Sequence, residues 1–174
     1  MTDRASVQIF ADDLLIGQTF VGEARRIGDD QFRAFAEMTG DDHPIHYDDA
    51  YAAKTRFGKR LAHGLLVMSM TALGATAISR QIEDAMVAFV EEAARFLKPV
   101  FVGDTLTSRF EVAAVDPKPA RGTALVRFNV SLSNDRNEVV LEGHHCYLLL
   151  LRSSAKSSSA EPSAAEASRP RDAV

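Results

Sequence analysis

Residues 65–80 read Leu-Leu-Val-Met-Ser-Met-Thr-Ala-Leu-Gly-Ala-Thr-Ala-Ile-Ser-Arg, and they contain the longest apolar stretch of the 174-residue chain. A helix of this composition is apolar on every face, so other elements must surround it. Its small residues, which allow neighbours to approach closely, are Ala72, Gly74, Ala75 and Ala77. The stretch is too short and too polar to span a bilayer unaided. We therefore expect a long, buried central helix.

Four strand-like runs follow this segment, at residues 87–100, 105–115, 123–133 and 138–151. In the second and third runs apolar residues alternate with polar ones, which is typical of strands with one face in water. The turns between them are short, and short connections favour antiparallel neighbours. The expected fold class is α+β, with an antiparallel sheet curled around the central helix.

The residues before the apolar stretch predict shorter elements. Residues 17–27 look extended, and a short helix follows that begins at Asp29 or Asp30 and ends at Gly40. A proline within residues 41–46 then favours a loop of defined shape.

Composition and charge exclude several classes of partner. Apolar residues make up 46% of the chain, charged residues 25%, and the formal net charge is only -4. Lys and Arg are scattered among acids, so we expect no nucleic-acid partner. The single cysteine, Cys146, rules out an intramolecular disulfide and suits a reducing cytoplasm. The acidic N-terminus is unlike a secretory leader, so we expect a cytoplasmic protein without a membrane partner.

Residues 153–174 are rich in Ser, Ala, Pro, Glu and Arg and show no apolar periodicity. Such a segment cannot offset its ordering entropy by burial. We predict one folded domain over residues 1–152 and a disordered tail over 153–174.

The side chains best suited to chemistry lie just before the apolar stretch. Asp41 and His46 flank the proline turn, so both could point into one cleft and hold a water molecule. A carboxylate and an imidazole are a workable pair for moving protons near neutral pH. An Asp that follows a glycine is also commonly just a turn residue.

Gly64 offers a second element of a site, because a ligand carbonyl can approach its backbone N–H without meeting a side chain. The first turn of a helix favours developing negative charge. Such a donor opposite a water-holding pair suits the addition of water to a conjugated thioester. The alternative is that His63 and Gly64 simply form the entrance of a helix.

Other polar residues have simpler explanations. His144 and His145 lie in a strand, where surface and sheet-packing roles are expected. Arg56, Lys59 and Arg60 form a basic cluster that could meet a nucleotide phosphate, although a solvated loop is the simpler interpretation.

Residues 36–74 resemble the MaoC-like, (R)-specific enoyl-CoA hydratase family. The family pattern is Asp, two residues, Pro, one residue and His, followed by Ala-His-Gly before the central helix. Here it reads Asp-Asp-His-Pro-Ile-His at 41–46 and Ala-His-Gly at 62–64. The segment 98–105, Lys-Pro-Val-Phe-Val-Gly-Asp-Thr, is also similar, so the resemblance extends over most of residues 17–151.

The resemblance implies a hot-dog fold, in which the sheet wraps a central helix and two subunits pair through their sheets. It also implies a hydro-lyase that hydrates 2-enoyl-CoA to (R)-3-hydroxyacyl-CoA, or runs in reverse. Its substrate would be an acyl-CoA, with no cofactor beyond the CoA of that substrate. We expect a homodimer and possibly a higher homo-oligomer.

Carried over by position, the catalytic residues fall on Asp41 and His46, and the oxyanion N–H falls on Gly64. We place His63 and His43 with Gly64 on the substrate-binding side. The family usually has Asn where this chain has His43. The imidazole of His43 must therefore take over the role of that amide, or the role is lost.

Three rival interpretations stay open. A hot-dog thioesterase normally carries its acid on the central helix, but residues 65–78 contain no Asp or Glu. A non-catalytic acyl-CoA-binding partner subunit would follow if His43 had spoiled the site. A metal site could use four possible ligands, Asp41, His43, His46 and His63. We expect no metal, because His43 and His46 straddle a proline turn.

Overall fold

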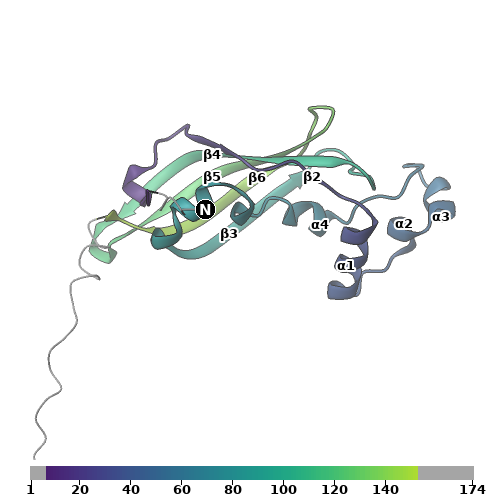
Figure 1. Cartoon of the computed structure of the whole chain (residues 1–174), viewed down its shortest axis with the longest axis horizontal. Coiled ribbons are helices and arrows are strands. Elements are labelled where there is room, and N and C mark those ends of the chain that lie inside the picture. The colour runs from purple at the N-terminus through teal and green to yellow at the C-terminus, as the bar shows by residue number, and fades with distance from the viewer. Residues whose placement is uncertain (1–6, 153–174) are drawn as a thin grey trace, which may run out of the picture.

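One antiparallel sheet dominates the computed structural model, which describes residues 7–152. Six strands occur in this part of the chain: β1 Thr19–Val21, β2 Arg25–Arg26, β3 Met86–Phe96, β4 Thr105–Lys118, β5 Thr123–Asn134 and β6 Val139–Leu150. Their order is β1-β4-β5-β6-β3, and β2 also pairs with β4 (Figure 1). The four expected strand runs and the antiparallel sheet are therefore confirmed. The predicted tail, 153–174, lies outside the described residues.

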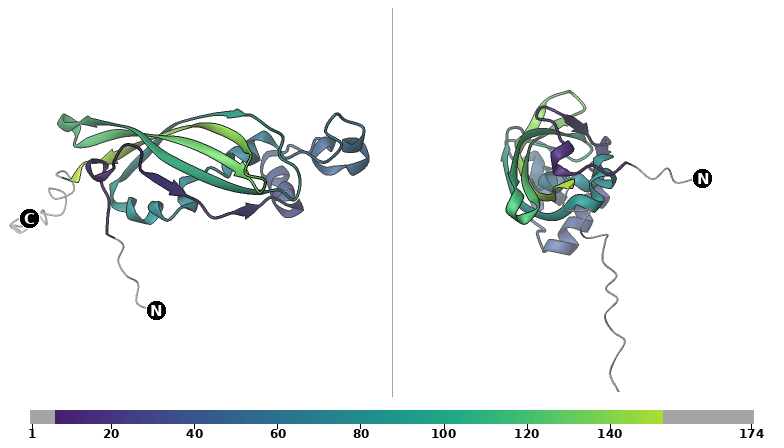
Figure 2. Two further views of the ribbon diagram at one scale, coloured as in Figure 1. Left: turned by 90° about the horizontal axis from the view of Figure 1, so that it is seen from above. Right: turned by 90° about the vertical axis from the view of Figure 1, so that its left-hand side faces the viewer.

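The sheet curls, and its inner face is buried against the helical segment that precedes β3 (Figure 2). Alternate residues of β5 point into this core, and Val126, Phe128 and Leu132 are fully buried. Ile78 and Ile82 belong to the same apolar cluster as Val126 and Phe128. The alternation seen in the sequence therefore matches the wet and dry faces of the sheet.

The continuous helix expected over 65–80 does not form. Short pieces replace it, namely α4 Gly64–Ser69, η2 Leu73–Ala75, α5 Ile78–Gln81 and η3 Glu83–Ala85. The hydroxyls of Thr71 and Thr76 donate to the carbonyls of Met68 and Leu73, and such local bonds compete with helix propagation. Thr76 also forms a bridge with Gly22 beyond the end of β1.

The turn expected between the runs 105–115 and 123–133 begins later than position 116. β4 continues to Lys118, and the turn is formed by η4 Pro119–Arg121 and by Gly122, which has a left-handed φ of 64°. Pro117 is tolerated within the strand because β1 and β2 pair only with residues 105–111 of β4. Pro117 therefore has a neighbouring strand on one side only, and such an edge position is where a sheet tolerates a residue without a backbone N–H.

The segment before α4 projects beyond the sheet (Figure 1). It contains α1 Asp29–Thr39, α2 Pro44–Tyr47 and α3 Asp49–Ala53, while a short η1 Ala11–Asp13 lies near the N-terminus. The N-cap of α1 is Gly28 rather than an Asp, and Gly40 ends the helix as expected, with a φ of 76°. The loop expected over 41–46 is half helical, because its proline occupies the first position of α2.

A glycine on β6 provides a test of the close pairing of β3 and β6. A Cβ at Gly143 would clash with the backbone carbonyl of Ala93, so Gly143→Ala should lower the free energy of unfolding by about 1–3 kcal/mol or more. The matched control is Gly74→Ala, where a Cβ meets nothing within 4 Å. Chemical denaturation of both variants measures the difference, and equal stabilities would contradict this pairing.

Candidate active site

Asp41, His46 and His63 meet at the base of the projecting segment. Their carboxylate and imidazole donor atoms lie within 4.8 Å of one another. Asp41 follows the glycine that ends α1, His46 lies on α2, and His63 is the N-cap of α4. The structure therefore brings together the predicted catalytic pair and one of the predicted substrate-binding residues.

The position of His46 is set by one hydrogen bond and one ring contact. Its Nδ1 lies 2.6 Å from the carbonyl oxygen of Leu61, which can only accept, so Nδ1 carries a proton. In the neutral ring this leaves Nε2 with a free lone pair. The ring also stacks on His63, with centroids 3.8 Å apart. His46 is thus held in the tautomer that can accept a proton at Nε2.

Tyr47 is a residue of this site that the sequence did not suggest. Its hydroxyl lies 2.8 Å from the carbonyl of Phe32, 3.3 Å from that of Asp41 and 2.8 Å from Nε2 of His63. One side chain therefore ties α1, the Asp41 loop and the start of α4 together. No motif spacing indicates such a contact, because it joins residues up to 16 positions apart.

His63 is the buried neighbour on which the ring of His46 stacks. It is only 2% exposed, and its Nδ1 has no hydrogen-bond partner among the described residues. Burial, followed by the nearby His46, lowers the pKa of His63, while burial raises the pKa of Tyr47. Both groups are therefore neutral near pH 7. The role of His63 in substrate binding stays a prediction.

His43 has a local structural role. It is exposed, and its Nδ1 accepts a hydrogen bond from the N–H of Ile45 at 3.3 Å, so it is the N-cap of α2. Asn is among the best N-cap residues, because its side-chain oxygen accepts the same kind of bond. The imidazole can therefore replace the amide usual at this position. His43 is therefore no longer a candidate metal ligand, because it is not part of the converging cluster.

Gly64 is the first residue of α4, so its N–H has no acceptor within the helix. A Cβ here would lie 3.3 Å from the ring of Phe96, at the end of β3. Glycine thus leaves room between the helix and the strand. Because α4 has six residues, its dipole contributes less than that of the long helix expected.

Arg60 of the basic cluster and His145 of the strand pair have structural roles. Arg60 contacts Asp29 at 2.6 Å and Asp49 at 2.9 Å, so it holds α1 and α3 together rather than lying in a solvated loop. His145 is 3% exposed and packs against Phe110 in the sheet, as expected for a packing residue.

A hollow of about 650 Å³ lies near the start of β3, on the inner face of the sheet. Most of its wall is apolar, and it includes Met68, Leu73, Met86 and Phe89. Such a hollow can hold a small apolar group.

No helix within residues 7–152 is long and apolar enough to cross a membrane.

The buried, neutral His63 predicts how stability changes with pH. As pH falls below the ordinary value of 6.5, the unfolded His63 binds a proton before the folded one does, so the free energy of unfolding decreases. His63→Gln removes this group, and the loss of stability between pH 7 and 5 should become smaller. His145, whose pKa is also lowered by burial, maintains part of the slope. Denaturation at both pH values measures it, and an unchanged slope would contradict the assignment.

Comparison with known proteins supports the fold. A family model described as "MaoC like domain" matches residues 13–133. A solved structure of a Mycobacterium tuberculosis protein, whose description states a double hotdog fold, superposes with a TM-score of 0.70 at 26% identity. That match covers 83% of this chain and 44% of the other. The hot-dog fold is therefore confirmed, with the central helix broken into pieces.

Two curated relatives are similar over much of their length. A 3-hydroxybutyryl-CoA dehydratase of Methylorubrum extorquens is 30% identical over 78% of this chain and 80% of the relative. An (R)-specific enoyl-CoA hydratase of Aeromonas caviae is 34% identical over 63% of this chain and 79% of the relative. From the extent of these matches, this chain belongs to the family of proteins with a MaoC-like domain.

Proposed function

We propose that this protein is a hydro-lyase that adds water to 2-enoyl-CoA thioesters to form (R)-3-hydroxyacyl-CoA, or catalyses the reverse reaction. The observation that carries the proposal is the meeting of Asp41 and His46 next to the free N–H of Gly64. Relatives named as a dehydratase and a hydratase of CoA thioesters support the same class of reaction.

In the proposed mechanism, Asp41 and His46 hold one water molecule. The water oxygen bonds to the β-carbon of the enoyl group while one of the pair takes its proton. The pair returns a proton to the α-carbon on the same face, so no net charge accumulates. The fixed tautomer of His46 provides a proton acceptor at Nε2, which is what general base catalysis requires.

The N–H of Gly64 would bind the thioester oxygen, where negative charge develops as the enolate forms. Loss of one such donor in other enzymes costs roughly 3–4 kcal/mol of transition-state stabilisation. Phe96 leaves no room for a side chain at this position without displacement of its ring.

We further propose that hydration needs no metal, although Asp41, His46 and His63 could reach one ion together. An acid–base pair supplies both proton transfers of the reaction, so no metal-bound water is required. Hydratase activity should therefore survive treatment with a chelator.

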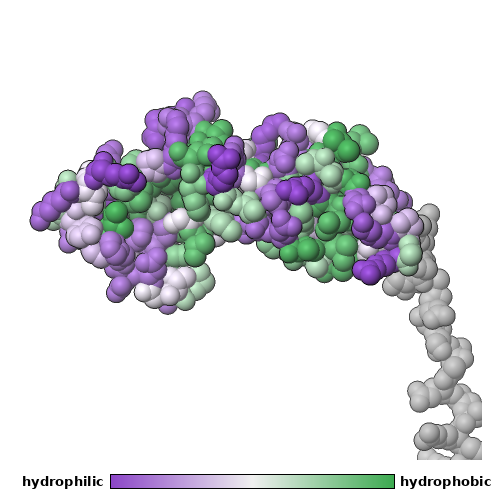
Figure 3. Space-filling view, turned by 180° about the vertical axis from the view of Figure 1, so that it is seen from behind, coloured by the Kyte–Doolittle hydropathy of each residue, from purple (hydrophilic) through white to green (hydrophobic). Residues whose placement is uncertain are grey.

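The edge of the sheet favours a homodimer. β3 has a neighbour on one side only, and an exposed edge strand is a template for pairing with another chain. Its exposed apolar side chains, which are 39–56% accessible, are Met86, Val87, Phe89, Val90 and Phe96. Apolar surface is also visible on the rear face of the molecule (Figure 3). We propose that two copies pair antiparallel along β3.

This pairing would complete the active site. Met86 lines one end of the hollow, whereas Gly64 lies near Phe96, roughly 30 Å farther along β3. The other end of the hollow is formed by Met68 of α4, the helix that begins at Gly64. In an antiparallel pair centred near Glu91, the Met86 end of one strand lies beside the Phe96 end of the other. The acyl group of a thioester bound at one subunit's catalytic pair would then extend toward the Met86 end of the partner's hollow.

The first test follows loss of the conjugated thioester of crotonyl-CoA, with chiral analysis of the product. Asp41→Asn and His46→Ala should each lower the rate by about 10²–10⁴-fold, because each removes a proton carrier. The matched control, Asp42→Asn, changes the neighbouring carboxylate and should retain activity. Release of free CoA would instead identify a thioesterase. Normal acyl-CoA binding without turnover of short, branched or carboxylated enoyl-CoAs would indicate a binding subunit.

The dimer is tested with a charge on each edge of the sheet. Val90→Lys, on β3, should convert the dimer to a monomer and abolish hydration, because a lysine there opposes pairing of two strands. Val21→Lys, on β1 at the opposite edge and similarly exposed, should remain dimeric. Light scattering gives the mass of each. A dimeric Val90→Lys variant would place the interface elsewhere.

A further inference from the structure

A bulge in the edge strand β3 lies opposite a row of polar residues on β6. Phe89 pairs with Tyr147, and the next pair is Glu91 with Cys146, so Val90 is an extra residue. In a regular strand Glu91, two residues after Phe89, would lie on the same face as Phe89, which is the inner face of the sheet. Bulges often re-aim a side chain in this way. Here the bulge turns Glu91 to the outer face.

On that outer face Glu91 meets two other metal-binding side chains. Cys146 lies directly opposite it in the register, and His144 precedes the cysteine by two residues, on the same face of β6. An oxygen of Glu91 lies 2.7 Å from Nε2 of His144. The carboxylate, imidazole and thiol donor atoms all lie within 4.8 Å of one another.

We propose that Glu91, His144 and Cys146 form a binding site for one Zn²⁺ ion, separate from the active site. Oxygen, nitrogen and sulfur are the three donors that zinc accepts in proteins, at about 2.0–2.3 Å. Two such bonds span at most about 4.6 Å, so the observed spread requires only a small rotation of side chains to bind the ion. Water would complete a tetrahedral site.

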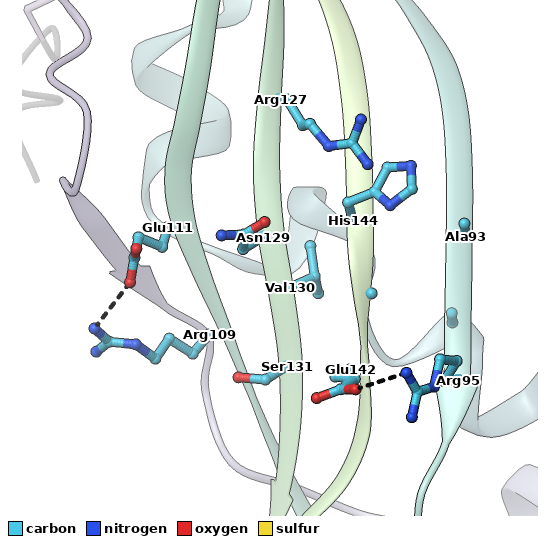
Figure 4. Close-up of a pocket in the computed structure, with 12 residues that line it drawn as sticks. Ala93, Arg95, Arg109, Glu111, Arg127, Asn129, Val130, Ser131, Glu142 and His144 are labelled. Atoms are coloured by element: carbon cyan, nitrogen blue, oxygen red, sulfur yellow. Dashed lines mark ion pairs between the residues drawn. The ribbon is translucent and has the colours of Figure 1, made fainter.

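The surroundings allow an ion to reach the site. The Glu91 side chain is 55% exposed, and His144 lines an open hollow of about 620 Å³ on the outer face. Cys146 is itself buried, so its thiolate would bind the ion from the side of the sheet, whereas Glu91 would bind it from the solvent side. Figure 4 shows Arg127 beside His144 on the neighbouring strand, with Asn129 next along that strand.

The charges of the cluster are compatible with a divalent cation. A thiolate and a carboxylate together neutralise Zn²⁺, although Arg127, which pairs with Cys146, adds one positive charge nearby. Burial, and then the carboxylate of Glu91, raises the pKa of the Cys146 thiol. Binding must therefore release the thiol proton to solvent, and affinity should rise with pH.

The ion would fasten the edge strand to the sheet. Its ligands come from β3 and β6, so binding stabilises the native pairing of these strands. Pairing of β3 with a second subunit uses backbone groups and leaves the side chains on their own faces. The site is therefore compatible with the proposed dimer, and it does not depend on the proposed reaction.

Cobalt provides a sharp test, because this chain has only one cysteine. We would titrate the reduced, full-length, metal-free protein with Co²⁺ and record the near-ultraviolet band of thiolate-to-cobalt charge transfer. One equivalent should produce the band, and Zn²⁺ should displace it. The cluster of Asp41, His46 and His63 contains no sulfur, so an ion there cannot give this band.

Variants distinguish a site with three protein ligands from metal binding by the Cys146 thiol alone. Cys146→Ser should abolish the band, and Glu91→Gln and His144→Ala should each weaken Co²⁺ binding at least tenfold. Asp41→Asn, which alters the other cluster, should leave the titration unchanged. Zn²⁺ should also raise the melting temperature of the wild type but not of Glu91→Gln, an exposed substitution that preserves the fold. Absence of the band, or a band that is equally strong in Glu91→Gln and His144→Ala, would overturn the proposal.

Discussion

The inner face of the curled sheet must be covered, and this constraint organises the rest of the molecule. The strands β4, β5 and β6 bury rows of large apolar side chains on that face, and Phe110 and Phe128 are fully buried. The segment from α4 to η3 supplies the cover, with Leu73, Ile78 and Ile82 in the same cluster. Because this segment must follow a curved surface, short helical pieces fit where one straight helix was expected. Gly64 is thereby placed at the end of the cover, next to the projecting segment.

The projecting segment is held by polar contacts in addition to an apolar cluster, in which Phe32 and Phe35 of α1 pack with Leu66 of α4. Arg60 joins α1 to α3 through Asp29 and Asp49, and Tyr47 joins α1 to the Asp41 loop and to His63. These bonds hold an exposed Asp41 close to a half-buried His46. The proposed catalytic pair needs this kind of support, because Asp41 lies on a loop, and loops have few apolar contacts to fix them.

The edge strand β3 carries two unlike faces. The bulge at Val90 turns Glu91 outward and leaves Glu92 inward, where an oxygen of Glu92 lies 3.3 Å from His145. Glu91 therefore belongs to the outer cluster, whereas the adjacent Glu92 forms part of the polar wall of the inner hollow. In the proposed dimer, the same strand pairs through its free backbone edge with a second subunit. Three different surfaces therefore depend on one strand and on the position of its extra residue.

The sequence alone determined the strands and the turn glycine at position 40, because these depend on local alternation and on backbone conformation. It also indicated that Asp41, His46 and Gly64 lie near one another, since they flank a proline turn and a helix start. Tertiary structure decided the break-up of residues 65–80, the capping role of His43 and the contacts of Tyr47. It likewise placed Glu91 beside His144, residues 53 positions apart in the chain. Such features depend on which surfaces meet after folding, and pairwise contacts between distant residues leave no periodic trace in the sequence.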